Sequence, residues 1–310
     1  MQLNVVIPIL STIVLDDGIN PPTTINNPVG AYDFTGEAWV SIVATDCINV
    51  TELIMGSNPD LGTLTITGSP TLPKLTVSGT SIVTLDLSEQ TEVSELNISS
   101  NSSLTTLNLS ALDHVDTGIG ITINPLLTAL NLSAFLYVNG DIDFQNNSGL
   151  VTLDLLSLNS FAQNLYLTDC SSLVTLNLSG LDASGSGAVG CQLDTGACVS
   201  LVTVTLPAVW PFVDNFTVNL SDNALSQASV DGVINSAYAS FPAITASTID
   251  VSGDSSISNS PPSGTAETKA LAMITAGNTV LYNATALEFW TKGGDALVMQ
   301  TTSETLGYRV

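Results

Sequence analysis

Apolar residues recur along this chain in a short motif, Φ-x-x-Φ-x-Φ, where Φ is apolar and x is any residue. The motif begins at Val50, Leu61, Leu72, Ile82, Val93, Leu104, Leu127, Leu150, Leu173 and Leu201. Successive starts are first 10 or 11 residues apart and later 23, 23, 23 and 28 residues apart. Since the later spacings are about twice the earlier ones, the repeating unit is a coil of about 22 residues made of two similar halves.

The second halves of the longer units keep an alternation of apolar and other residues. It is seen at Ile121-Thr122-Ile123, Ile142-Asp143-Phe144, Leu165-Tyr166-Leu167 and Cys191-Gln192-Leu193. A period of two is typical of a β-strand with one buried face, so each coil is predicted to contain two short strands. No coil can bury its apolar side alone, and the coils must therefore stack. The predicted fold over residues 45–210 is a mainly β, leucine-rich-repeat-like parallel β-solenoid.

The repeat lengthens after about residue 210. Leu220, Val251 and Tyr282 occupy equivalent positions 31 residues apart, which leaves room for a helix in each coil. Two intervening segments, Ser226–Ala239 and Thr265–Ala276, each have one apolar face, and the first begins with a serine that can act as an N-cap. Residues 211–283 are therefore predicted to be α/β units of the same solenoid.

The two ends of the chain lack the repeat. Solenoids need atypical ends to cover their exposed core, so residues 1–44 and 284–310 are predicted to be cap or attachment segments. The last segment contains aromatic and arginine side chains of the kind that anchor protein interfaces. These candidate interaction residues are Phe289, Trp290, Tyr308 and Arg309.

Small polar residues dominate the outward central positions of the predicted strands. On one sheet these positions are Thr65, Asp86, Asn108, Asn131, Asp154, Asn177 and Thr205. On the other sheet they are Thr76, Asn97, Thr122, Asp143, Tyr166 and Gln192. Interface anchors are rich in Trp, Tyr and Arg, which these faces almost lack. Intermolecular contacts are therefore expected at edges, loops or caps.

The charge balance excludes some classes of partner. Acidic residues outnumber basic ones 28 to 4, which gives a formal net charge of −24. Nucleic-acid binding is excluded because neutralising phosphates takes Lys and Arg, and the same shortage disfavours anionic lipid. No apolar run is long enough to cross a membrane. The apolar opening, residues 1–15, has no basic start of a secretory signal, so it is interpreted as a β-strand.

Residues suited to catalysis are sparse. The one histidine, His114, is interpreted as a solvated turn residue, and neither a nucleophile motif nor a P-loop is present. Candidate carboxylate pairs for glycoside hydrolysis include Asp141 with Asp143 and Asp86 with Asp154. These are isolated acids among small polar residues. The sequence therefore predicts no catalytic residue, no cofactor and no enzymatic activity.

No metal ligands are predicted either. Asp-containing turns offer the oxygen ligands that Ca²⁺ takes, but no D-x-D-x-D-G loop occurs, so bound Ca²⁺ stays an open alternative. The cysteines match no zinc spacing. They are Cys47, Cys170, Cys191 and Cys198. We interpret them as buried free thiols, with a bridge from Cys170 to Cys191 or Cys198 as the alternative.

The block from Val218 to Asn283 carries a family resemblance. It contains VNLSDNALSQASVDGVIN and then STIDVSGDSSISNSPPSGTAETKALAMITAGNTVLYN. This block resembles the C-terminal repeats of leucine-rich-repeat-like proteins encoded among virion genes of tailed bacteriophages and prophages. The resemblance implies a non-enzymatic structural protein on the exterior of a virion, either a capsid decoration or a tail- or fibre-associated host-attachment protein. Implied partners are other virion proteins and a host receptor or glycan.

Two other classes stay open at this stage. A bacterial cell-surface or secreted leucine-rich-repeat adhesin would share the repeat and the Ser-, Thr- and Asn-rich composition typical of proteins outside cells. A polysaccharide-degrading tailspike-type enzyme would need an acidic pair. The sequence sets neither the oligomeric state nor the attached terminus.

Overall fold

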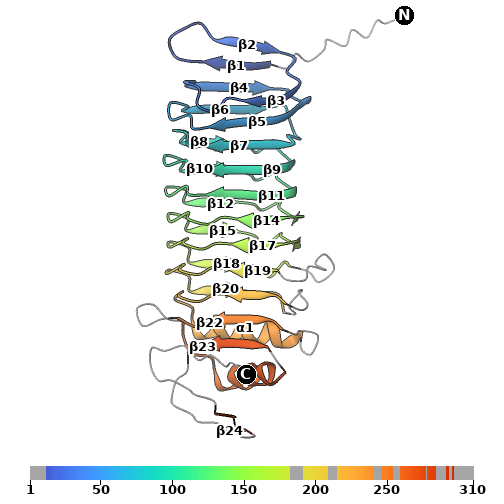
Figure 1. Ribbon diagram of the computed structural model, residues 1–310, viewed down its shortest axis with the longest axis vertical. Helices are drawn as coiled ribbons and strands as arrows, with labels where there is room; N and C mark the ends of the chain where they lie inside the picture. Colours follow the sequence, from blue (N-terminus) through green and yellow to red (C-terminus); the bar gives the residue numbers. More distant parts are fainter. Residues whose placement is uncertain are drawn as a thin grey trace, which may run out of the picture.

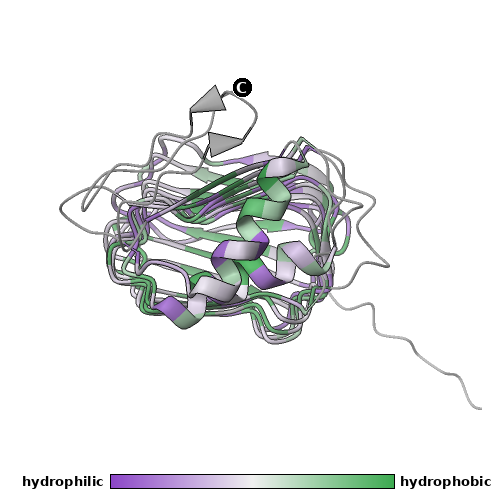
Figure 2. Cartoon of the chain, turned by 90° about the horizontal axis from the view of Figure 1, so that it is seen from below, coloured by the Kyte–Doolittle hydropathy of each residue, from purple (hydrophilic) through white to green (hydrophobic). Residues whose placement is uncertain are grey.

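The structure is a computed structural model, and it describes residues 12–181, 191–208, 215–240, 246–253, 259–276, 278–283, 291–292 and 295–296. Over these residues the chain is a parallel β-solenoid whose coils stack from the N-terminal to the C-terminal end, with two helices near the C-terminal end (Figure 1). Viewed along the stack, the coils lie one behind another around a common outline (Figure 2). The predicted fold class is confirmed.

One sheet, which we call the long sheet, runs along the whole stack with all neighbouring strands parallel. In order its strands are β3 (Gly30–Asp33), β5 (Val50–Gly56), β7 (Lys74–Ser78), β9 (Glu92–Ser99), β11 (His114–Thr122), β14 (Asp141–Asp143), β17 (Asn164–Tyr166), β19 (Gln192–Asp194), β21 (Thr217–Asn219), β22 (Thr248–Val251) and β23 (Thr279–Tyr282). Two further strands, β13 (Tyr137–Val138) and β16 (Ser160–Phe161), extend the pairing beside β11.

The other half of each coil adds a strand to a second wall. Its middle part, the short sheet, consists of β8 (Thr84–Asp86), β10 (Thr106–Asn108), β12 (Ala129–Asn131), β15 (Thr152–Asp154), β18 (Thr175–Asn177) and β20 (Thr203–Thr205). Before it lie β2 (Thr23–Asn26), β1 (Thr12–Asp16), β4 (Ser41–Thr45) and β6 (Thr63–Thr67), of which β1 is antiparallel to its neighbours. Strands β3 and β4 thus extend both walls into the segment predicted as an N-terminal cap. A separate antiparallel pair is formed by β24 (Thr291–Lys292) and β25 (Asp295–Ala296).

The core lies between the two walls and is continuous along the stack. In the short sheet the inward leucines of neighbouring strands lie opposite one another in register, and all are buried: Leu85, Leu107, Leu130, Leu153 and Leu176. One buried cluster extends from Ile13 to Tyr282. Each coil therefore buries its apolar side against the next one, as the repeat predicts.

Buried amides line the corner where the chain leaves the long sheet. We call this set the asparagine row: Asn58, Asn101, Asn124, Asn147 and Asn223. Asn223 confirms the leucine-rich-repeat pattern around it, because its Nδ2 donates to the carbonyl of Leu220 at 2.9 Å and to Thr195 Oγ1 at 2.9 Å. The row supplies hydrogen bonds to backbone groups that the turn leaves without strand partners.

The cysteines are buried free thiols, as predicted. Cys170 and Cys198 lie in neighbouring coils at positions equivalent to the asparagine row, where their sulfurs donate to the carbonyls of Phe144 and Leu167 at 3.2 and 3.0 Å. Burial raises the pKa of the Cys191 thiol to about 11, so this thiol stays protonated at neutral pH and is a poor metal ligand.

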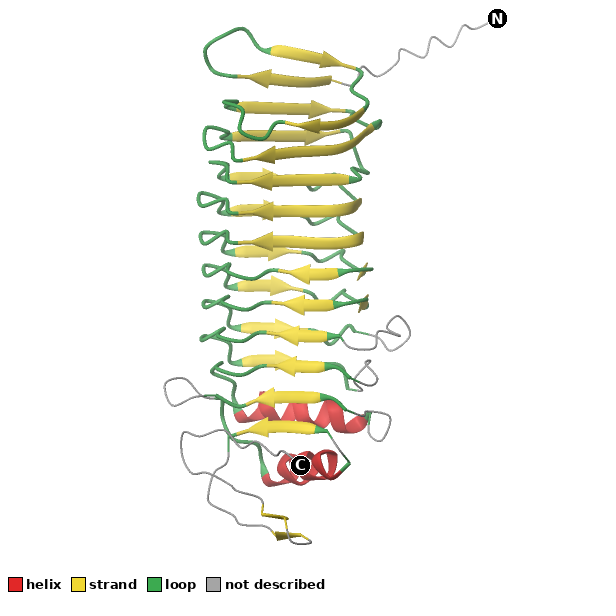
Figure 3. Cartoon of the chain, in the orientation of Figure 1, coloured by secondary structure: helices red, strands yellow, loops and turns green. Residues whose placement is uncertain are grey.

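The two helices replace short-sheet strands in the last coils (Figure 3). Helix α1 (Gln227–Ala239) packs beside β20 and beside α2 (Gly264–Thr275). The predicted N-cap Ser226 accepts a hydrogen bond from the backbone N–H of Ser229, and Ser263 caps α2 in the same way. Both helices begin within one residue of their predicted starts. Neither has the length and apolarity that crossing a membrane would require.

Candidate functional site on strand β11

Strand β11 is one of the places where the long sheet departs from its regular pattern; the pairing of β3 with β5 also shifts register, between Gly30 and Ala31. Its register with β9 holds at Val115, shifts, and resumes at Gly118. Two residues of β11, Asp116 and Thr117, therefore lie opposite the single residue Ser94 of β9. Such a β-bulge re-aims side chains, and bulges are enriched next to functional sites.

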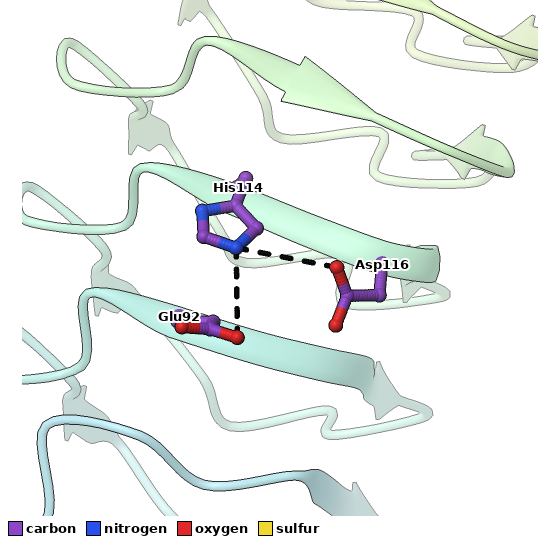
Figure 4. A group of neighbouring side chains, drawn as sticks. All are labelled: Glu92, His114 and Asp116. Carbon is purple, nitrogen blue, oxygen red and sulfur yellow. Dashed lines mark ion pairs between the residues drawn. The ribbon is translucent and has the colours of Figure 1, made fainter.

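The strands at this bulge bring one imidazole and two carboxylates together (Figure 4). Register places His114 of β11 opposite Glu92 of β9, and Asp116 lies two residues farther along β11. The Nε2 atom of His114 is 3.6 Å from Glu92 Oε1 and 4.0 Å from Asp116 Oδ1. One ligand atom from each of the three side chains lies within 4.8 Å of the others. We call this group the β11 cluster.

Further contacts hold the histidine in place. Its Nδ1 is 3.4 Å from Asp113 Oδ2, and its ring stacks on Tyr137 of the next coil with ring centroids 4.8 Å apart. Only 17% of the His114 side chain is exposed. The interpretation of His114 as a solvated turn residue is therefore wrong: it begins a strand and is covered by an aromatic ring.

A shallow hollow of about 350 Å³ lies on the same face just beyond the bulge. It opens there because Gly118 and Gly120 place no side chain in the outward rows of the sheet. Polar side chains line it: Glu95, Asn97, Thr117, Asp141 and Asp143. A glycine inside a strand weakens the strand and often marks a place where another group approaches the backbone.

Two predicted outward central positions are wrong. Register aligns Gly120, in place of Thr122, with Asn97. It aligns Asp194, in place of Gln192, with Tyr166. Each error shifts the strand pattern by two residues.

The two candidate acidic pairs differ in how far apart their two members lie. Asp141 and Asp143 are neighbours on β14 at the hollow. Asp86 and Asp154 lie on β8 and β15, three strand spacings apart. The two strands are therefore about 14 Å apart, which is farther than the separation between the two catalytic carboxyl groups of a glycosidase.

Tyr166 lies on β17 beside Asp143 of β14. Partial burial raises the pKa of its phenol above the ordinary value. Three carboxylates raise this pKa further: those of Asp141, Asp194 and Asp143. The face around Tyr166 is therefore strongly acidic, and the phenol stays a hydrogen-bond donor at neutral pH.

The bulge explains why residue 140 is a glycine, and substitution of Gly140 tests this explanation. A Cβ added at Gly140 would overlap the backbone carbonyl of Thr117, whereas a Cβ at Gly120 would approach nothing closer than Asn97 Oδ1 at 3.9 Å. We expect Gly140→Ala to lower the free energy of unfolding by about 1–3 kcal/mol, because backbone must shift. The matched control Gly120→Ala should leave the urea unfolding midpoint nearly unchanged. Equal midpoints for the two variants would contradict the bulge geometry.

The candidate interaction residues Phe289, Trp290, Tyr308 and Arg309 lie outside the described residues. Comparison of the chain with protein-family models, with curated proteins and with solved structures gave no match. Function is therefore inferred from the chain's own pattern and geometry.

Proposed function

We propose that this protein is a non-enzymatic structural component of a bacteriophage virion, on the exterior of the particle. The observation that carries the proposal is the unbroken stack of parallel coils around one continuous core. In such a stack each coil is fixed by its neighbours, so the whole acts as a stiff spacer or support. The virion setting is supported by the resemblance of the block from Val218 to Asn283 to phage virion repeats.

The outer surface of the short sheet supports a spacer role. Its first outward row consists almost entirely of threonines: Thr84, Thr106, Thr152, Thr175 and Thr203, with Ala129 between the second and third. Short polar side chains without aromatic or arginine anchors suit contact with water better than a tight protein interface. The high negative charge keeps such a surface soluble. Attachment through the C-terminal segment fits this arrangement.

The proposal predicts that the chain is present in phage particles and that its C-terminal segment is required for incorporation. We expect the chain in purified phage particles from the strain that encodes it, at a fixed ratio to the major capsid protein by mass spectrometry. Replacing Phe289, Trp290, Tyr308 and Arg309 together by Ala should reduce incorporation at least tenfold, because these residues supply the anchors. The control Asn177→Lys, on the short sheet, should be incorporated normally.

Absence of the chain from particles would overturn the virion role. Normal incorporation of the quadruple variant, together with loss for Asn177→Lys, would make the sheet the attachment face.

A second candidate, a cell-surface or secreted adhesin, is favoured by the hollow beyond the bulge. Carboxylates and an amide there can hydrogen-bond sugar hydroxyls, and Tyr166 nearby adds an aromatic face. A host-attachment protein of a virion would use the same surface. Recovery of the chain in the cell-surface or secreted fraction, with none in phage particles, would select the adhesin.

A further inference from the structure

The β11 cluster has the spacing of a group that shares one cation. Separations of 3.6 and 4.0 Å from His114 Nε2 to the carboxylate oxygens of Glu92 and Asp116 are too long for good hydrogen bonds. Two ligands of a tetrahedral metal ion, each about 2.1 Å from it, lie about 3.4 Å apart. The three ligand atoms lie within 4.8 Å of one another, so the part-exposed carboxylates of Glu92 and Asp116 would have to move inward to share one ion.

Other residues already orient the three ligands. Asp113 Oδ2 lies 3.4 Å from Nδ1, where it can accept the Nδ1 proton of the tautomer that binds a metal ion through Nε2. A carboxylate on the far nitrogen of a ligating histidine is a common feature of metal sites. The Ser94 hydroxyl donates to Asp116 Oδ2 at 3.0 Å, which leaves Oδ1 to face the imidazole.

The charge around the cluster also favours a cation. Glu92, Asp113 and Asp116 surround a single imidazole, in a chain with a formal net charge of −24. Lys74, a nearby cation on β7, is engaged by Glu52 at 2.9 Å and Glu95 at 3.5 Å. Negative potential that a lysine does not neutralise concentrates divalent cations at the surface.

We propose that Glu92, His114 and Asp116 form a binding site for one divalent transition-metal cation of the zinc class. The imidazole nitrogen selects such a cation over Ca²⁺ and Mg²⁺, which prefer all-oxygen sites. Three protein ligands leave at least one coordination position for water or for a group from a binding partner. Because Glu92 and His114 come from adjacent coils, the cation also fastens β9 to β11.

The test uses the full chain, stripped of metal with a chelator and titrated with Zn²⁺, Co²⁺ or Ca²⁺ by calorimetry. We expect one Zn²⁺ per chain, Co²⁺ at the same site with visible absorption bands, and Ca²⁺ binding at least tenfold weaker. Glu92→Gln should weaken Zn²⁺ binding at least tenfold. The matched control on the same strand, Glu95→Gln, should bind Zn²⁺ like the unchanged chain.

Asp113→Asn tests whether Asp113 orients the His114 imidazole. We expect this variant to bind Zn²⁺ about tenfold or more weakly, because residues that hydrogen-bond to metal ligands have effects of this size. His114 is the only histidine in the chain, so its imidazole NMR signals report on this site in the unchanged protein. Zn²⁺ should shift these signals at one equivalent. No saturable one-to-one binding, unshifted imidazole signals, or equal affinity of Glu92→Gln and Glu95→Gln would each overturn the proposal.

Discussion

Leu130→Asp is expected to unfold the solenoid under conditions where the unchanged chain is folded. Leu130 is the central residue of β12, is 2% exposed, and lies in register with Leu107 and Leu153 of the adjacent coils. Loss of a buried leucine costs about 2–5 kcal/mol. An unpaired carboxylate in the same place costs several kcal/mol more, and whole domains are stable by only about 5–15 kcal/mol.

The preceding residue provides a matched control for this variant. Ala129 is exposed and lies opposite Thr106 and Thr152, so Ala129→Asp adds the same charge to the outer surface. Circular dichroism should show a cooperative melt for Ala129→Asp close to that of the unchanged chain, and no native signal for Leu130→Asp. Similar melting temperatures for both variants would mean that Leu130 does not face the core.

The inward positions of the coils could be predicted from the sequence because buried strand positions are occupied by apolar residues. Leu107, Leu153 and Leu176 each sit between polar neighbours, and Leu130 sits between Ala129 and Asn131. This alternation predicts a strand with one buried face. The starts of the helices were also predictable, because Ser226 provides a hydroxyl where the first turn has unpaired N–H groups. These features depend on nearby residues alone.

The register of β11 and β19 with their neighbouring strands could not be predicted from the apolar alternation. Ile119 and Ile121 of β11 and Ile123 directly after it continue the same alternation, although Ile123 has a φ of 58° and is 51% exposed. Directly after β19 the polar residue Thr195 is buried, and its hydroxyl accepts a hydrogen bond from Asn223. An apolar pattern does not reveal an inward residue whose partner comes from another coil.

The β11 cluster was missed for a related reason. Its members come from different coils: Glu92 precedes His114 by 22 residues, and Tyr137 follows it by 23. Both intervals equal one coil, which is the signal that could have found the cluster. That signal requires His114 to be on a strand, and the sequence around it was interpreted as a turn. The extra residue of the bulge that follows becomes visible only in the pairing with β9.

The asparagine row shows that polar contacts between coils also determine stability. Asn124 is fully buried, and its Nδ2 donates to the carbonyl of Ile98 at 3.0 Å. Its Oδ1 accepts from the backbone N–H of Asn101 at 3.1 Å, and its own N–H donates to Asn147 Oδ1 at 3.0 Å. One amide side chain thus satisfies backbone groups of the preceding coil on both its donor and acceptor sides. Water cannot easily replace it in a buried corner.

We therefore expect Asn124→Leu to lower the free energy of unfolding by about 2–6 kcal/mol, measured by urea denaturation. Leucine is close to asparagine in size, but it leaves the Ile98 carbonyl and the Asn101 N–H buried without partners, at about 1–3 kcal/mol each. The same change at an exposed site, Asn131→Leu on β12, removes one solvent-exposed hydrogen bond from the Ser133 N–H and should lower stability by no more than about 1 kcal/mol. A loss below about 1 kcal/mol for Asn124→Leu would mean that water reaches this corner. In that case the asparagine row would add little to the leucine packing and strand pairing that join the coils.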